Sequence, residues 1–170
     1  MPTFHVVSSD SPVLVEASSS LHPVRAESRA LAGTITVELD GSGRPDLSRP
    51  YAARLRIPVE TIRSGHALQD LEMHRRLDTR RHPEITVDLT EVAATAAEGV
   101  YRAVARVAVR GRAQLLDGEV EVRVDGDRLS VEGRRPIDMR SFGVEPPRLL
   151  LLRVDPEVLV RVRIAAQRQA

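Results

Sequence analysis

The stretch Glu119-Val120-Glu121-Val122-Arg123-Val124-Asp125 alternates strictly between charged and apolar residues. Successive side chains of a β-strand point to opposite faces, so this alternation predicts a strand with one face in a core and the other in water. The pattern does not fit an α-helix, whose apolar residues recur every three to four positions. The stretch therefore indicates an antiparallel sheet with one solvated face.

The same alternation returns in other parts of the chain. Every second residue is apolar, or is a glycine, in residues 31–39, 55–59, 85–89 and 158–164. Two further segments, Tyr101–Val109 and Leu149–Leu152, carry apolar residues on both faces. We expect the outer faces of these two segments to be covered, either by a helix or by a partner subunit.

Turn-forming residues separate the alternating segments. Asp117-Gly118 and Asp125-Gly126-Asp127 predict tight hairpins, because Asp and Gly accept the positive φ angles of two-residue turns. Gly41-Ser42-Gly43 predicts a longer connection, and Glu145-Pro146-Pro147 predicts a break before the last strands. About eight strands result, a number that can close into a barrel that is either filled or holds one small ligand.

One segment departs from the strand pattern. Between residues 66 and 77 the apolar residues are spaced closer to a helical than to a strand period: Leu68, Leu71, Met73 and Leu77. Ser64 can cap the start of this helix, and Pro83 follows its end. We therefore predict an all-β protein, one domain over residues 1–170, built as a single antiparallel, roughly eight-stranded β-barrel with one short α-helix.

Composition excludes several classes of function. Of the 170 residues 42% are hydrophobic but only 2% are aromatic, so Val, Leu, Ile and Ala must build the core. The 25 basic residues are all Arg and nearly balance the 24 acidic residues, which argues against bulk attraction to nucleic acid. The absence of Cys excludes disulfides, Cys-ligated zinc and a thiol nucleophile.

The N-terminal segment Met1–Asp10 has neither a basic region nor a long apolar region, so it does not read as a secretory signal. The longest solidly apolar run, Leu149–Leu152, is far too short to span a bilayer. From these two observations we expect a cytoplasmic protein without a membrane span.

Five stretches, in order and in register over roughly residues 13–165, resemble motifs of the YceI-like family. They are Leu55–Gly65, Leu68–Thr86, Val107–Gly111, Arg140–Val144 and Leu152–Val158. For example, Arg140-Ser141-Phe142-Gly143-Val144 is similar to the family's motif of arginine, any residue, an aromatic residue, glycine and an aliphatic residue. Agreement of five short motifs in register is more specific than any one of them.

The resemblance implies an extended eight-stranded barrel of lipocalin type. In the family the lumen binds long amphiphiles such as polyisoprenoids or quinone-like lipids, and many members are exported. This chain departs from the family by having fewer aromatic residues and no recognisable signal peptide. Its N-terminal strand, Ser11–Ala17, lacks the family's usual aromatic residue and the histidine that follows it, and His22 stands as a displaced remnant.

The first candidate site is the lumen of the barrel. Strand alternation assigns one apolar set to the inward face: Leu55, Ile57, Val59, Ile85, Val87, Val107, Val109, Val120, Val122, Val124, Val160 and Val162. These side chains are of medium size, so eight strands of them can leave a void. An apolar void suits a lipid, because each buried CH₂ group contributes roughly 0.8 kcal/mol. The alternative is that the side chains meet and fill the core.

The second candidate is a group of arginines near the helix: Arg75, Arg76, Arg80 and Arg81. Guanidinium groups form bidentate contacts with phosphate and carboxylate, so this group can hold the head group of an amphiphile at the barrel mouth. The alternative, which we favour, is a solvated face paired with Glu72, Asp78 and Glu84.

The third candidate is a metal site formed by His66, Asp70 and His74, whose spacing of four residues places them on one helix face. His82 can join them. The alternative, which we favour, is that these are exposed polar residues of an amphipathic helix. We therefore predict no metal and no cofactor.

We expect the chain to bind, sequester or transport a hydrophobic amphiphile of the isoprenoid, quinone or fatty-acid type. A first alternative is an enzyme that acts on a hydrophobic small molecule through polar residues near the helix, although no nucleophile elbow or catalytic set stands out. A second alternative is a ligand-free interaction module, a homodimer formed through Leu149–Leu152 and Val104–Ala108.

Overall fold

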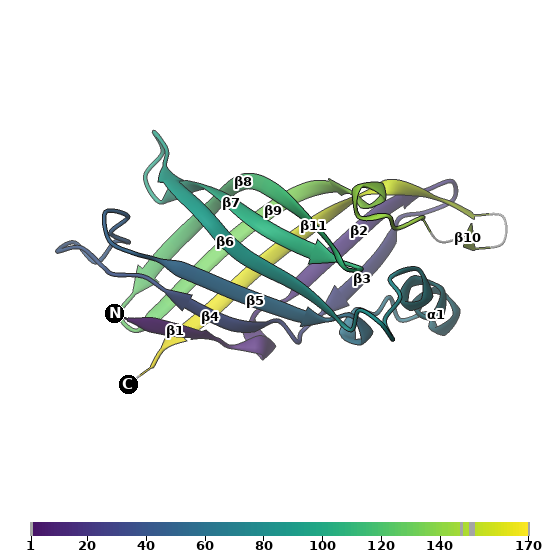
Figure 1. Ribbon diagram of the computed structural model, residues 1–170, viewed down its shortest axis with the longest axis horizontal. Coiled ribbons are helices and arrows are strands. Elements are labelled where there is room, and N and C mark those ends of the chain that lie inside the picture. The colour runs from purple at the N-terminus through teal and green to yellow at the C-terminus, as the bar shows by residue number, and fades with distance from the viewer. Residues whose placement is uncertain (1, 147, 150–151, 170) are drawn as a thin grey trace.

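The chain folds into an elongated barrel with a short helix at one end (Figure 1). The computed structural model describes residues 2–146, 148–149 and 152–169. The strands are β1 (Thr3–Val6), β2 (Val13–Ser19), β3 (Val24–Ser28), β4 (Ala32–Thr36), β5 (Ala52–Pro58), β6 (Glu84–Ala94), β7 (Val100–Val109), β8 (Arg112–Asp125), β9 (Arg128–Asp138), β10 (Arg148–Leu149) and β11 (Leu152–Arg168). The helices are α1 (Ala67–Arg76) and the 3₁₀ turns η1 (Ser8–Asp10), η2 (Val59–Thr61) and η3 (Met139–Phe142).

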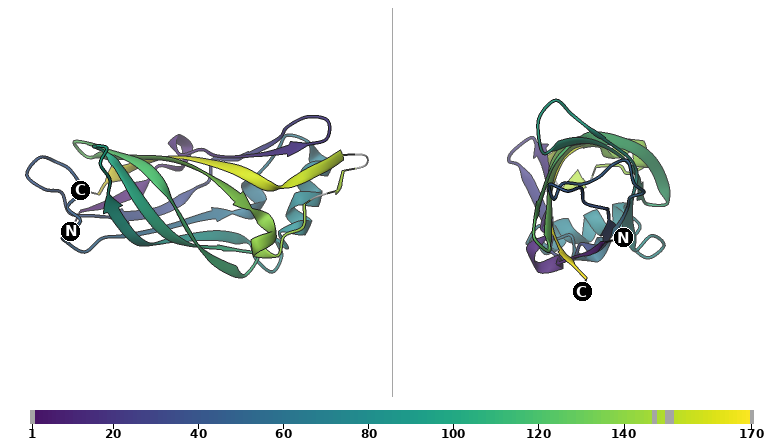
Figure 2. Two further views of the ribbon diagram at one scale, coloured as in Figure 1. Left: turned by 90° about the horizontal axis from the view of Figure 1, so that it is seen from above. Right: turned by 90° about the vertical axis from the view of Figure 1, so that its left-hand side faces the viewer.

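Eight strands close the barrel. Antiparallel neighbours follow in the order β1-β4-β5-β6-β7-β8-β9-β11, and β11 returns to β1, with Phe4 opposite Arg168. Figure 2 shows the resulting ring when the barrel is viewed from one end. β2 and β3 extend the sheet from β11, so β1 and β2 both lie along one edge of that long strand. The predicted all-β, eight-stranded antiparallel barrel with one short α-helix is confirmed.

Strand register assigns the two faces of the wall as the alternation predicts. Val122 in β8 stands opposite Val131 in β9, which stands opposite Ile164 in β11, and all three face the interior. On the outer face Glu132 stands opposite Arg163, and Arg163 Nε lies 3.1 Å from Glu132 Oε1. Cross-strand pairs of opposite charge support such a wall modestly, because they are exposed to water.

One predicted hairpin is confirmed and one is wrong. Gly126-Asp127 joins β8 to β9, with Asp125 opposite Arg128. Asp117-Gly118, however, lies inside β8, with Gly118 opposite Ala103. The turn between β7 and β8 is instead Arg110-Gly111, whose φ angles of +53° and +75° are the positive values that a two-residue hairpin requires. Long-range pairing along the whole of β7 therefore overrides the local turn preference of Asp-Gly.

Covering of the two-sided apolar segments by a helix or a partner subunit stays a prediction. In β7 the outward positions Val104 and Ala108 alternate with the exposed Arg102 and Arg106, so this outer face is partly polar. Within Leu149–Leu152, residues 150 and 151 lie outside the described residues. The side chains of residues 149 and 152 lie outside the described part as well. The proposed dimer surface there stays a prediction.

The described part of the chain contains no helix long and apolar enough to cross a membrane. α1 has only ten residues.

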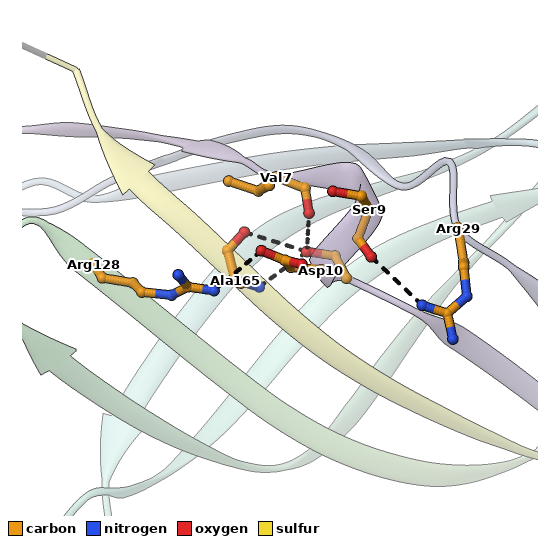
Figure 3. Close-up of polar contacts among 7 residues, drawn as sticks. Val7, Ser9, Asp10, Arg29, Arg128 and Ala165 are labelled. Atoms are coloured by element: carbon orange, nitrogen blue, oxygen red, sulfur yellow. Dashed lines mark hydrogen bonds and ion pairs between the residues drawn. The ribbon is translucent and has the colours of Figure 1, made fainter.

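A buried polar junction connects β1 to β2 along β11 (Figure 3). The chain turns through η1, and Ser11, which is fully buried, lies against Ala165 of β11. Ser11 Oγ lies 2.8 Å from the Val7 carbonyl oxygen and 3.2 Å from that of Ala165, and it accepts the Ala165 N–H at 2.9 Å. At the surface of the same junction Arg128 lies 3.3 Å from the Asp10 carboxylate.

The junction predicts that Ser11→Ala destabilises the fold by about 1–3 kcal/mol, because it leaves the buried Ala165 N–H without its acceptor. Urea unfolding followed by circular dichroism measures this change. Ser18→Ala, at an exposed position of β2, is the control and should change stability by less than about 0.5 kcal/mol. Equal stability of the two variants would contradict the role assigned to Ser11.

Candidate functional site

The interior of the barrel is hollow. A cavity of about 500 Å³ runs inside it, lined by side chains from every strand between β2 and β9 and from β11. Most of these side chains are apolar, and small residues such as Ala53, Ala103, Ala105 and Gly118 are among the lining residues. A volume of this size lies within the range of about 300–1,000 Å³ that is typical of small-molecule sites. The space can therefore accept a hydrophobic ligand.

Ten of the twelve residues assigned to the lumen line this cavity: Leu55, Ile57, Ile85, Val87, Val107, Val109, Val120, Val122, Val160 and Val162. Val59 does not, because β5 ends before it and η2 buries it beside Leu77 and Phe142. Val124 does not either, because it packs against Leu129 at the end of the hairpin. That any of the ten contacts a ligand stays a prediction.

The four aromatic residues all lie in the interior of the barrel, either along the cavity or in the core. Tyr51, Tyr101 and Phe142 line the cavity, and Phe4 packs in the core at the end of the barrel that holds both termini. The Tyr51 hydroxyl accepts the Val92 N–H at 3.0 Å, just after β6 shifts its register against β7. None of these four residues was among the predicted site residues. The small number of aromatic residues in a chain with a large core was the one feature of the sequence that could have pointed to them.

Helix α1 lies at the end of the barrel away from the termini (Figure 1). Its apolar residues are divided between the cavity and solvent. Met73 and Leu77, which follows the helix, line the cavity. Leu68 and Leu71 are 79% and 67% exposed. The sequence predicted the helix correctly but could not assign these two leucines to solvent.

Two side-chain contacts hold α1 to the preceding segment. Asp70 Oδ1 accepts from both the backbone N–H and the hydroxyl of Ser64, each at 2.7 Å. His74 Nε2 donates to the Ile62 carbonyl oxygen at 2.8 Å. The predicted cap by Ser64 is wrong, since His66 occupies the N-cap position and no side chain caps the helix. Asp70 therefore anchors the helix from within its first turn.

These contacts also separate the predicted metal ligands. Asp70 and His74 turn to different main-chain partners, His66 is exposed, and His82 lies against Gly111. No three His, Cys, Asp or Glu side chains converge closely enough to hold a metal ion anywhere in the described ranges. Spacing of four residues placed the groups near one helix face, but their hydrogen bonds direct them apart.

Of the four arginines proposed to hold a head group, only Arg76 lines the cavity. Its Nε donates to Glu72 Oε1 at 2.8 Å, and Arg75 lies 3.8 Å from the other carboxylate oxygen. Arg80 and Arg81 are exposed and do not line the cavity. The alternative of a paired, solvated face fits Arg75 and Arg76, whose partner is Glu72.

Charged residues reach the cavity at a different place, where β8 and β9 part. Their ladder ends with Val120 opposite Gly133, although both strands continue beyond that pair. Beside this opening Arg135 lines the cavity from the inward face, whereas Asp117 and Glu119 stand opposite the outward Val104 and Arg102 and border it from the outer face. Arg135 was not predicted as a site residue, although period-two alternation from Leu129 places it on the inward face.

Hydrogen bonds within turns lower the pKa of three carboxyl groups. The Ser42 hydroxyl lowers the pKa of Asp40, and the Ser48 hydroxyl lowers the pKa of Asp46. The Arg140 side chain, followed by its N–H, lowers the pKa of Asp138 at the start of η3. None of these three carboxylates lines the cavity, so the shifts reflect local turn structure.

Comparison with known proteins identifies both a family and a fold. The model of the YceI-like domain matches residues 4–166. BcnA of Burkholderia cenocepacia has a similar structure, with a TM-score of 0.79 and 17% identity over 95% of this chain and 99% of that one. A domain from Saccharophagus degradans, described as polyisoprenoid-binding and implicated in plant cell wall breakdown, has a TM-score of 0.74 and 14% identity over 96% and 97%.

The YCEI protein of Campylobacter jejuni is also similar, with a TM-score of 0.68 and 8% identity over 86% of each chain. A comparison with curated proteins found no significant match. At these identities the solved structures establish the shared fold.

The anchoring of α1 predicts that Asp70→Ala destabilises the helix by about 1–2 kcal/mol, because it removes both bonds to Ser64. Native-state hydrogen exchange of residues 67–77 measures this change locally. Arg75→Ala, at an exposed position of the same helix, is the control and should leave exchange nearly unchanged. If the two variants exchange alike, Asp70 does not anchor the helix.

Proposed function

This chain belongs to the YceI-like family, and from that premise we propose that its barrel binds a hydrophobic amphiphile of the isoprenoid, quinone or fatty-acid class without transforming it. The observation that carries the proposal is the cavity of about 500 Å³ with an almost wholly apolar wall. The description of a structurally similar domain as polyisoprenoid-binding supports the same ligand class.

The energetics favour a long chain over a short one. About ten buried methylene groups contribute roughly 8 kcal/mol, while association costs at least about 4 kcal/mol of translational and rotational freedom. The remaining ~4 kcal/mol gives only roughly millimolar affinity. About fifteen methylenes leave ~8 kcal/mol and roughly micromolar affinity. A wall of this composition therefore suits a ligand with an extended hydrocarbon chain.

The positions of the polar groups near α1 also favour ligand binding over catalysis. His66 and His74, which the enzyme alternative requires, do not line the cavity. The Asp70 carboxylate lines it, but its Oδ1 is already hydrogen-bonded to Ser64. We therefore propose that the chain sequesters or carries its ligand, with affinity supplied by desolvation of the hydrocarbon chain.

The proposal predicts that protein purified without added lipid carries a co-purifying amphiphile, detected by mass spectrometry of an organic extract. Ala105→Phe should abolish most of this lipid, because the new ring projects into the cavity. Ala108→Phe is the control, since Ala108 lies on the same strand, does not line the cavity and should leave the lipid content unchanged.

Thermal unfolding of both variants verifies that each remains folded. A folded wild-type protein that neither carries lipid nor takes up added palmitate or farnesol would contradict the proposed function.

A further inference from the structure

The wall of the barrel is incomplete between β8 and β9. The two strands pair from Asp125–Arg128 as far as Val120–Gly133, and no ladder pair between them follows in the described residues. Beyond that point, residues 112–119 still pair with β7 and residues 134–138 still pair with β11. The backbone groups that face each other across this opening therefore need partners other than a β-ladder.

Arg135 crosses the opening from the cavity side. It stands opposite Val160 on the inward face of β9, between Gly133 and Ile137 of the same strand. Its Cδ lies near Gly118 of β8, where a β-carbon placed on that glycine would be 4.0 Å away. The arginine stem therefore passes beside Gly118 at about van der Waals distance from the position of a β-carbon.

The guanidinium group of Arg135 is bound only in part. Nε donates to the Asp117 carbonyl oxygen at 2.7 Å, and Nη1 donates to the Pro136 carbonyl oxygen. Nη2 lies 3.8 Å from Asp117 Oδ1, which is too far for a hydrogen bond. A guanidinium carries five N–H groups, so several donors stay available while the two main-chain bonds fix its orientation.

The charge of Arg135 is also incompletely matched. The nearest carboxylate, Asp117, forms a closer ion pair with Arg102 on the outer face. Glu119 is exposed and stands opposite the outward Arg102, and the described residues show no ion pair between it and Arg135 within 4.0 Å. Arg76, by contrast, is already committed to Glu72. Arg135 is therefore better placed than Arg76 to bind an anionic ligand group.

We propose that Arg135 is the head-group anchor of the cavity and binds the terminal oxyanion of an amphiphile, either a carboxylate or a phosphate. This inference rests on the proposed function, because the hydrocarbon chain must lie in the apolar cavity for its end to reach the β8–β9 opening. A planar guanidinium held by two main-chain carbonyls is preorganised to contact two oxygens of such a group.

Displacement of the neutral apolar dye phenylnaphthylamine tests the proposal. Its fluorescence rises in apolar surroundings, so a competitor that enters the cavity lowers it. Palmitate is compared with hexadecanol, and farnesyl phosphate with farnesol, which differ in the terminal oxyanion. We expect wild-type protein to prefer at least one of the charged competitors over its neutral partner by about tenfold, as expected for a charge-assisted hydrogen bond. The pair with the larger preference distinguishes a carboxylate from a phosphate.

Arg135→Gln should abolish that preference while leaving binding of the dye and of both alcohols unchanged. Arg123→Gln is the matched control, because it removes the same charge from an exposed position of β8 that does not line the cavity. Circular dichroism verifies the fold of both variants. Equal displacement by charged and neutral competitors in wild type, or a preference that survives Arg135→Gln, overturns the role of Arg135. Failure of the dye and of all four competitors to bind overturns the proposed function instead.

Discussion

Closure of the sheet through β11 is the constraint on which the rest of the structure depends. This strand pairs with β9 on one edge and with both β1 and β2 on the other, so it joins the two ends of the chain. A closed barrel forces the inward residues of every strand to share one interior. β1 and β2 both pair with the same edge of β11, and the chain must pass from one to the other along that edge. The polar junction at Ser11 gives the buried Ala165 N–H of β11 an acceptor at the point between them.

The hollow follows from which residues meet in that shared interior. Val, Leu, Ile and Ala make up most of the wall, while Phe4 and Phe142 belong to buried core clusters. Side chains of this size leave an apolar void between the facing parts of an eight-stranded wall. The low aromatic content is thus a cause of the cavity and does not weaken the core.

The departures from regular barrel structure lie where polar groups approach the cavity. α1 is held by Asp70 and His74, and the opening between β8 and β9 is bridged by Arg135. Proteins commonly break local rules at functional positions and compensate elsewhere. In this chain the side chains of Asp70, His74 and Arg135 hydrogen-bond to main-chain atoms at these two places and so stabilise the irregular backbone.

The sequence by itself determined the elements and the faces of the strands. Alternation around Val122 and Val160, the turn at Gly126 and the helical spacing before Leu77 sufficed, because periodicity is a local property of the chain. Only the tertiary structure decided that Asp117-Gly118 lies within a strand and that Asp70 and His74 turn apart. Strand pairing and its end points depend on residues far apart in the chain, and these long-range contacts override local preferences.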